Sequence, residues 1–266
     1  MARPFQILCL AAMVLLGGCT DNRQEPQLDG IKIDELAPTG RTGRAVQPRV
    51  LQTTNIDVTT FELPAENIGR LVDIWNMLST GSLRYNNSAG FAANGLQASA
   101  GKYDAYHKII ALLKSADAKK LSTTSLLIPN GQAEMLNIGR LTRKTTISYI
   151  GRRGDVETAD AGPGTLGLQV SARQFSGSQP VANVHVVPLI SASTEGLPKE
   201  LAERLRENDL RFYSAGFRVI MKQGDILMLA PREYNPDETA AAGRFFIKPE
   251  PNPTVILLLF ICTSIS

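Results

Sequence analysis

The glycine-rich run at residues 162–167 comes closest to a known chemical motif. Gly162, Gly164 and Gly167 match the pattern G-x-G-x-x-G literally. In dinucleotide-binding proteins this pattern follows a strand and opens a helix that holds the pyrophosphate. Here a polar loop precedes the glycines, and a strand is expected over residues 165–174 in place of the helix. The run therefore does not predict a nucleotide site.

Three acidic residues lie close together just before these glycines. Asp155, Glu157 and Asp160 occupy a glycine-containing segment, and carboxylates of this kind could bind a cation weakly. Their spacing lacks the EF-hand pattern. We therefore interpret the segment as the solvated tip of a loop, with cation binding as the alternative.

Other chemical signals are sparse. The two histidines of the chain, His107 and His185, are far apart in sequence and each lies inside an expected helix or strand. The sequence contains no Walker loop, no G-x-S-x-G elbow, no HExxH and no closely spaced cysteine pair. The sequence therefore predicts no catalytic residue, no cofactor and no metal site, so we do not expect an enzyme.

The N-terminus carries the strongest local signal. Arg3 precedes an apolar stretch over residues 5–16, and Leu16-Gly17-Gly18-Cys19 follows. Small residues before a cysteine resemble the bacterial lipobox, in which the thiol is lipidated and becomes the new N-terminus. We predict that residues 1–18 are a signal peptide and that Cys19 is the lipidation site. Thr20 in place of an aspartate favours the outer membrane.

Composition indicates a globular body behind this anchor. Hydrophobic residues make up 43% and charged residues 20% of the 266 residues, which excludes a disordered chain. The net charge is only +3 and no basic face stands out, so nucleic-acid binding is not expected. Residues 19–54 are polar and contain several prolines and glycines, and we interpret them as a flexible tether.

Periodicity predicts an α+β fold in two parts. Residues 55–120 form a small α+β unit, with a strand at 55–63, a helix from Pro64 to about Gly81, a turn at Asn94-Gly95 followed by a strand within 91–99, and a helix over 104–115. The strand at 121–128 completes the βαβαβ order and opens the second part. Residues 121–266 are β-rich. Further strands are expected at 132–138, 143–150, 165–174, 181–190, 216–222, 225–230 and 254–263.

Turn residues predict how some of these strands connect. Asn130-Gly131 is a strong hairpin signal, and Gly224-Asp225 suggests a second hairpin. Residues 198–208 predict a charged surface helix, or alternatively a docking helix for a partner. The run VILLLFIC at 255–262 is too short to cross a bilayer as a helix, and predicts a strand that is either fully buried or faces lipid.

The order of motifs after Tyr103 resembles the core domain of bacterial secretins, the ring-forming outer-membrane channels of type II and type III secretion and of type IV pili. In that family a short helix leads to an L-S-x-P-x-L strand, an N-G-Q-x-A turn and a series of apolar strands. The matching stretches here are Leu121–Leu126, Asn130–Ala133, Leu166–Arg173, Val184–Ser191, Val219–Leu229, Gly243–Phe246 and Val255–Thr263.

Two departures from the family pattern follow the strand expected at 225–230. Ala230-Pro231 stands where the family has Gly-Gly, and the proline- and glycine-rich gate segment is missing between Pro231 and Gly243. The resemblance therefore implies a β-rich secretin-like sheet domain at 121–266. Because the gate segment is missing, it does not by itself imply an open pore. It implies an outer-membrane lipoprotein facing the periplasm that associates with itself or with other envelope secretion proteins. The alternative is a monomeric accessory or binding lipoprotein that has lost pore formation.

Overall fold

The computed structural model describes residues 51–175, 177, 180–193, 196–198, 200–201, 204, 208–235, 241–249 and 251–266. Cys19, the signal peptide, the tether up to residue 50 and most of the predicted helix at 198–208 lie outside the described residues. The segment Val50–Ser266 forms one compact unit.

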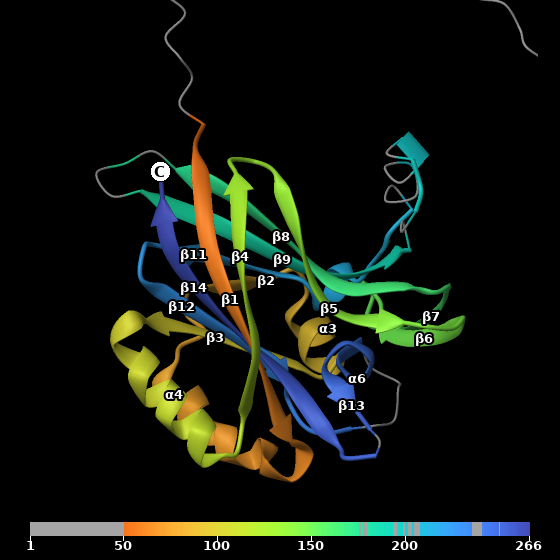
Figure 1. Cartoon of the computed structure of the whole chain (residues 1–266), viewed down its shortest axis with the longest axis horizontal. Coiled ribbons are helices and arrows are strands. Elements are labelled where there is room, and N and C mark those ends of the chain that lie inside the picture. The colour runs from red at the N-terminus through yellow and green to blue at the C-terminus, as the bar shows by residue number, and fades with distance from the viewer. Residues whose placement is uncertain are drawn as a thin grey trace, which may run out of the picture. The chain divides into compact units, whose positions relative to one another are not determined.

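The first of two large sheets is antiparallel and has the strand order β3-β12-β14-β1-β4, with β13 also paired to β14. Its central strand, β14, pairs with β12 on one side and β1 on the other (Figure 1). The sheet therefore joins the first described strand of the chain to the last. Its members are β1 (Thr53–Pro64), β3 (Leu96–Lys102), β4 (Lys119–Pro129), β12 (Asp225–Pro231), β13 (Ile247–Lys248) and β14 (Thr254–Ile265).

The second large sheet is also antiparallel and has the order β2-β11-β9-β8-β5, with β10 paired to β9. A separate hairpin of β6 (Thr145–Ile150) and β7 (Val156–Ala161) extends beyond it. The members of the second sheet are β2 (Leu83–Tyr85), β5 (Ala133–Leu141), β8 (Gly164–Phe175), β9 (Val181–Ala192), β10 (Leu210–Arg211) and β11 (Phe217–Met221).

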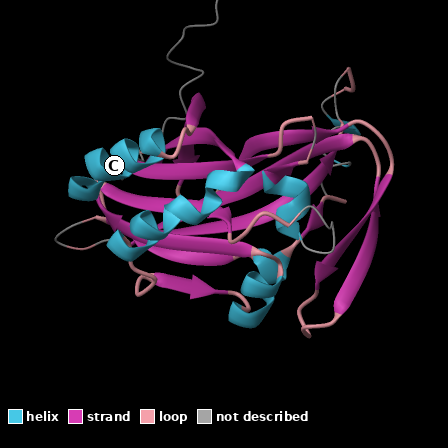
Figure 2. Ribbon diagram, turned by 90° about the horizontal axis from the view of Figure 1, so that it is seen from below, coloured by secondary structure: helices cyan, strands magenta, loops and turns pink. Residues whose placement is uncertain are grey.

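Short helices complete the fold, and several lie across one face of the strands in Figure 2. The segment after Pro64 begins as a 3-10 helix and continues as α2, so the predicted first helix is present but irregular. Residues predicted as the second helix form a 3-10 turn and then α4. The helices are η1 (Ala65–Leu71), α2 (Val72–Met77), α3 (Ser88–Ala93), η2 (Tyr103–Ala105), α4 (Tyr106–Ser115), η3 (Tyr213–Ala215) and α6 (Ala241–Phe246).

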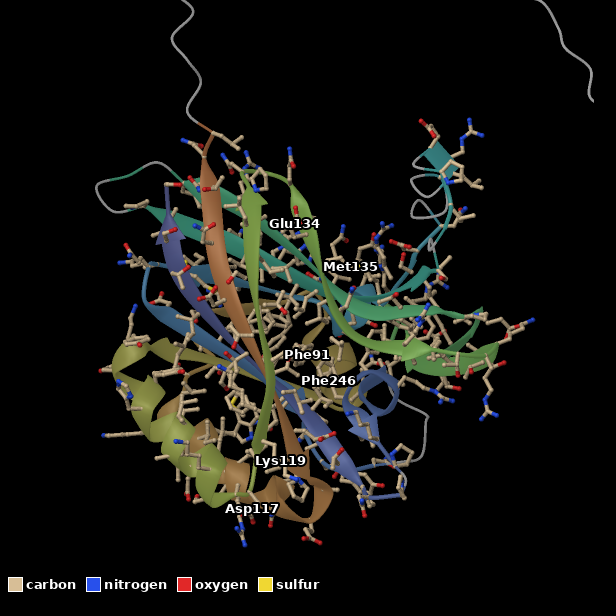
Figure 3. The ribbon with its side chains drawn as sticks, viewed as in Figure 1. Phe91, Asp117, Lys119, Glu134, Met135 and Phe246 are labelled. Carbon is tan, nitrogen blue, oxygen red and sulfur yellow. The ribbon has the colours of Figure 1, made fainter. Side chains whose placement is uncertain are left out.

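Two hydrophobic cores cover the two faces of the first sheet. One core lies between the two sheets, and Figure 3 shows Phe91 of α3 and Phe246 of α6 within it. The other core lies between the first sheet and the helices, where Ile74 and Ile109 pack against Val255 and its neighbours. Helices therefore form a layer on one face of the first sheet and the second sheet forms a layer on the other, which confirms the α+β, β-rich fold class.

The apolar run in β14 follows from this three-layer arrangement. Side chains alternate along a strand, so even-numbered residues such as Leu258 enter the core between the sheets, and odd-numbered residues such as Leu259 enter the helix-side core. Both leucines are only 1% exposed. A strand covered on both faces needs apolar residues at every position. The strand is thus buried within the chain itself.

Both predicted hairpin turns are present as turns, but neither connects paired strands. Gly131 has a φ of 79° and Gly224 a φ of 81°, which is the left-handed region that favours glycine. However, β4 pairs with β1 while β5 pairs with β8, so the turn at Asn130-Gly131 carries the chain from one sheet to the other. The turn at Gly224-Asp225 does the same between β11 and β12. Turn chemistry encodes a reversal of the chain, but not which strand becomes the partner.

The predicted boundary between residues 55–120 and 121–266 is not a boundary in the structure. Strands β1 and β3 from the first segment share one sheet with β4, β12 and β14 from the second. The division was wrong because it rested on the local order of elements, whereas β1 pairs with β14 about two hundred residues further along. The pairing of distant strands joins the two segments into a single unit.

Candidate functional site

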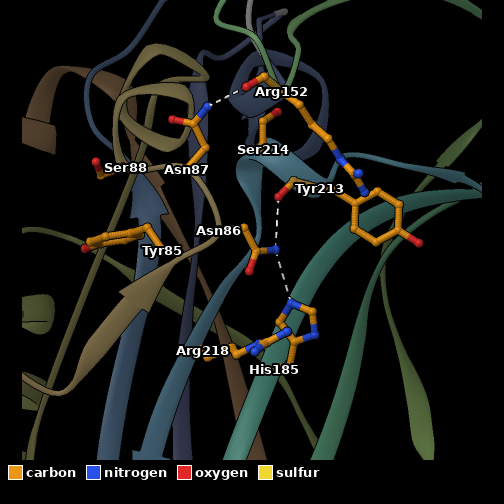
Figure 4. Close-up of a pocket in the computed structure, with 9 residues that line it drawn as sticks. All are labelled: Tyr85, Asn86, Asn87, Ser88, Arg152, His185, Tyr213, Ser214 and Arg218. Carbon is orange, nitrogen blue, oxygen red and sulfur yellow. Dashed lines mark hydrogen bonds between the residues drawn. The ribbon is translucent and has the colours of Figure 1, made fainter.

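An open pocket of about 780 Å³ lies at one end of the second sheet (Figure 4). It is formed where the chain after β2, the connection between β6 and β7, and the η3 turn meet strands β9 and β11. Its lining residues are polar or aromatic: Tyr85, Asn86, Asn87, Ser88, Arg152, His185, Tyr213, Ser214 and Arg218.

Two asparagines after β2 organise this end of the pocket. Asn87 accepts a hydrogen bond from the Gly90 backbone N–H at 2.8 Å, which caps α3, and its Nδ2 donates to the Arg152 carbonyl oxygen at 3.0 Å. Asn86 Nδ2 donates to the Tyr213 carbonyl oxygen at 3.1 Å and lies 3.2 Å from His185 Nε2. Because an amide N–H donates, the contact with His185 suits a neutral ring whose Nε2 accepts.

Glycine at position 216 makes room for this arrangement. A Cβ atom at Gly216 would lie 2.7 Å from Asn86 Nδ2 and 3.2 Å from the Val186 carbonyl oxygen. The Asn86 backbone N–H also donates to the Gly216 carbonyl oxygen at 3.0 Å. The absent side chain thus lets the Asn86 amide reach the histidine.

Buried hydrogen bonds fix the positions of the elements that form the pocket wall. Asn94 is fully buried; its Nδ2 donates to the carbonyl oxygens of Gly90 at 2.8 Å and Ile150 at 3.0 Å, and its Oδ1 accepts from the Ile150 N–H at 2.9 Å. Ser214 Oγ donates to the same Ile150 carbonyl oxygen. These bonds tie α3, the end of β6 and η3 together. In the sequence, Asn94-Gly95 is typical of a turn, and nothing there indicates this buried network.

Positive charge is aligned across three strands on this face. Arg218 of β11 lies directly opposite Arg84 of β2 on one side and His185 of β9 on the other. Directly opposed residues in an antiparallel pair share a face and lie close together, so like charges there repel. A further arginine, Arg152, places its guanidinium carbon 4.6 Å from the centre of the Tyr213 ring, a cation–π contact. The pocket is therefore electropositive.

The pKa of His185 is shifted by this environment. Burial of the ring lowers its pKa below the ordinary value, and the nearby Arg218 guanidinium lowers it further. The unfolded chain therefore binds more protons at this histidine than the folded chain does. The contribution of His185 to stability is present above the unfolded pKa and is lost as the pH falls towards the folded pKa.

Replacing Arg218 with glutamine is expected to raise the pKa of His185, because a positive charge beside the imidazolium is removed. The pKa should stay below the ordinary value, since burial remains. NMR titration of the His185 ring signals in the two proteins measures the change. An unchanged or lower pKa of His185 in the variant would contradict the charge coupling.

Of the three acidic residues, Asp155 lies exposed in the turn between β6 and β7, as the sequence suggested, whereas Glu157 and Asp160 lie on strand β7. Each of the latter two has its own partner: Tyr149 donates to Glu157 at 2.7 Å, and Thr146 donates to Asp160 at 2.7 Å. The hydrogen bond from Thr146 and the neighbouring Lys144 lower the pKa of Asp160. Within the described part of the chain, no group of three or more potential metal ligands comes together.

The remaining residues singled out from the sequence lie outside the pocket. Asp225 holds its turn by accepting from the Lys222 N–H at 2.9 Å, and it pairs with Lys102 at 2.6 Å. The Gly131 N–H donates to the Ala172 carbonyl oxygen at 2.8 Å, and the Asn130 side chain accepts from the Gln174 N–H at 2.9 Å. These residues connect the sheets, and the structure brings none of them into the pocket.

Cys262 is the free cysteine of the described chain and is fully buried in β14. Burial, together with the Asp225 carboxylate, raises the pKa of its thiol to about 11. A thiol that stays protonated at neutral pH is a poor nucleophile, so Cys262 serves as a small core residue.

The pocket residues were missed because no local pattern joins them. The lining residues Arg152, His185 and Arg218 come from separate elements. Only the register of β2, β11 and β9 aligns His185 and Arg218 with the adjacent Arg84. The one local hint is the strand 216–222, where Arg218 alternates with the buried residues Phe217 and Val219. Among the helices of the described residues, none is both long and apolar enough to span a membrane.

Comparisons with known proteins found little. No protein-family model matches the chain, and no curated protein matches it. Among solved structures, the chain is similar to InvG, the secretin of the Salmonella SPI-1 type III secretion injectisome, with 11% sequence identity and a TM-score of 0.16. The match covers 79% of this chain and 61% of that one. A similarity this weak leaves the chain unassigned to a family.

Proposed function

We propose that this protein is a secretin-like lipoprotein of the bacterial outer membrane, anchored through Cys19, that assembles with other copies or with other envelope secretion proteins and has no catalytic activity. The motif order from Leu121 to Thr263 supports the secretin-like part of the proposal. The lipobox-like sequence before Cys19 supports the anchor and the periplasm-facing location.

The observation that carries the assembly part is the open edge of strand β4. Within the described chain β4 pairs only with β1, and its residues 119–125 are all exposed. The opposite edge strand, β3, is partly covered, because Ser79 exchanges two backbone hydrogen bonds of 2.8 Å with Ala100. An edge strand offers unpaired N–H and C=O groups to another strand. Lys119 and Lys120 protect only its start, and the stretch that follows is uncharged.

A second candidate function is a monomeric accessory or binding lipoprotein. It is favoured by the burial of both faces of β12 and β14 inside one chain. Strands that are already satisfied within the monomer need no neighbouring subunit or lipid to cover them. The two candidates therefore differ in the oligomeric state that they predict.

Native sizing of the detergent-extracted protein decides between them. Under the assembly proposal the wild type elutes as a large particle, and Thr124→Lys shifts it towards the monomer because a charge on β4 opposes strand pairing. Thr158→Lys is the matched control, since Thr158 is exposed on β7, outside both large sheets. A wild type that is monomeric only would contradict assembly and support the second candidate.

The anchor needs its own experiment. Cys19→Ser is expected to abolish incorporation of labelled palmitate and to release the protein from membranes. Cys262→Ser is the control, because its position in the buried strand β14 excludes it from lipidation. Palmitate that still appears on Cys19→Ser would refute the anchor.

A further inference from the structure

The pocket at the end of the second sheet contains positive charge with no acidic residue to balance it. Among its lining residues Arg152 and Arg218 are cations, His185 is titratable, and none is an aspartate or glutamate. The ion pairs between described residues involve neither of these arginines nor the adjacent Arg84. Within the described residues, these positive charges are therefore not neutralised by an ion pair.

Like charges this close together repel one another, and a bound anion would offset the repulsion. Arg218 lies directly opposite Arg84, and directly opposed like charges are unfavourable; on its other side it lies opposite His185, whose charged form it disfavours. The effect is visible at His185, where Arg218 contributes to the lowered pKa. A negative group in the pocket would remove this repulsion.

The neutral lining residues also suit an anion. Both amide N–H groups of Asn86 are taken by the Tyr213 carbonyl oxygen and His185, whereas Asn87 keeps a second amide N–H beyond the one that donates to Arg152. That N–H and the hydroxyls of Ser88 and Tyr213 are hydrogen-bond donors at the same opening. Asn86 and Asn87 are held by the Tyr213 and Arg152 carbonyl oxygens, and Arg152 is held over the Tyr213 ring, as Figure 4 shows. Much of the donor set is thus fixed before any ligand arrives, which lowers the entropic cost of binding.

From these observations we propose that the pocket binds a small molecule carrying a phosphate group, with Arg152 and Arg218 as its charged contacts. A phosphate presents several acceptor oxygens and about two negative charges, so it can accept from donors on more than one side. A carboxylate has two oxygens in one plane and is satisfied by a single guanidinium. The pocket volume of about 780 Å³ leaves room for the organic part of the ligand. This site is independent of the strand edge at β4.

Isothermal titration of the full-length protein in non-ionic detergent tests the site with inorganic phosphate as the probe. Ionic strength is held constant with chloride, because unspecific screening would respond equally to both anions. We expect saturable phosphate binding that Arg218→Gln and Arg152→Gln each weaken by about tenfold or more, since each removes a charged hydrogen-bond donor. Both arginines are exposed, so neither change should disturb the fold.

Arg173→Gln is the matched control. Arg173 is an exposed arginine on β8 in the same sheet and does not line the pocket, so its loss should change the affinity by less than about twofold. The proposal is overturned if phosphate gives no saturable binding, or if Arg173→Gln weakens binding as much as Arg218→Gln. The same titration is repeated with citrate, a tricarboxylate. Tighter binding of citrate than of phosphate would contradict a ligand that is recognised by its phosphate group.

Discussion

Replacing Leu258 with alanine, and separately replacing Leu259 with alanine, is expected to lower the free energy of unfolding by about 2–5 kcal/mol in each case. The two residues are adjacent in β14 and each is 1% exposed. Leu258 belongs to the core between the sheets and Leu259 to the core beneath the helices. Each change removes buried methyl groups and leaves a cavity, and the loss is a large share of the 5–15 kcal/mol typical of a folded domain.

This pair of substitutions separates the two interpretations of the apolar run that the sequence left open. If one face of the strand faced lipid, only one of the two changes would lower the free energy of unfolding. Urea unfolding monitored by circular dichroism measures both, with Leu127→Ala as the control for the same chemical change. Leu127 lies on β4 in the same sheet and is 58% exposed, so its loss should cost less than about 0.5 kcal/mol. A small effect at either Leu258 or Leu259 would contradict the three-layer fold.

Replacing Gly164 with alanine is expected to lower the free energy of unfolding by about 2–3 kcal/mol, because the site has no room for a side chain. An added Cβ would lie 2.2 Å from the Ser191 carbonyl oxygen. Gly164 is buried on β8, between β9 and β5, and the obstructing atom belongs to the backbone of β9. The clash can therefore be removed only by a shift of the paired strands. A flexible side chain in the same place could rotate away.

Gly162→Ala is the control, and it comes from the same glycine-rich run. A Cβ at Gly162 meets nothing within 4 Å, so this change should alter the free energy of unfolding by less than about 0.5 kcal/mol. Thermal and urea unfolding of the two variants give the comparison. Equal effects at both positions would show that the close approach of β8 and β9 does not set the requirement for glycine.

The same geometry explains why the run resembles a nucleotide fingerprint. Gly164 and Gly167 lie on a strand, and the residues that follow Gly167 continue β8, with no helix opening there. At Gly167 an added Cβ would lie 2.8 Å from the Leu136 carbonyl oxygen of β5 and 2.7 Å from Met135 Cε. Glycine is needed at both positions for the close approach of neighbouring strands. The prediction that a strand would follow these glycines is confirmed, because β8 occupies residues 164–175.

Features that depend on neighbouring residues could be predicted from the sequence. Alternation predicted long strands such as β1, the continuous apolar run predicted β14, and the glycines predicted the turns at Gly131 and Gly224. These signals are local, since side-chain alternation and positive φ are properties of a few consecutive residues. Strand β2 was not predicted because three residues show no periodicity, and β7 was not predicted because its sequence, VETADA, is largely polar.

The pairing of strands, and the residues that this pairing brings together, became visible only in the folded chain. The partnership of β1 with β14 removed the expected domain boundary, and burial of both faces of β14 showed why VILLLFIC is apolar at every position. The alignment of Arg84, Arg218 and His185 depends on the register of three strands that are distant in sequence. A register shift of one residue would move each side chain to the other face, so no local pattern encodes the pocket.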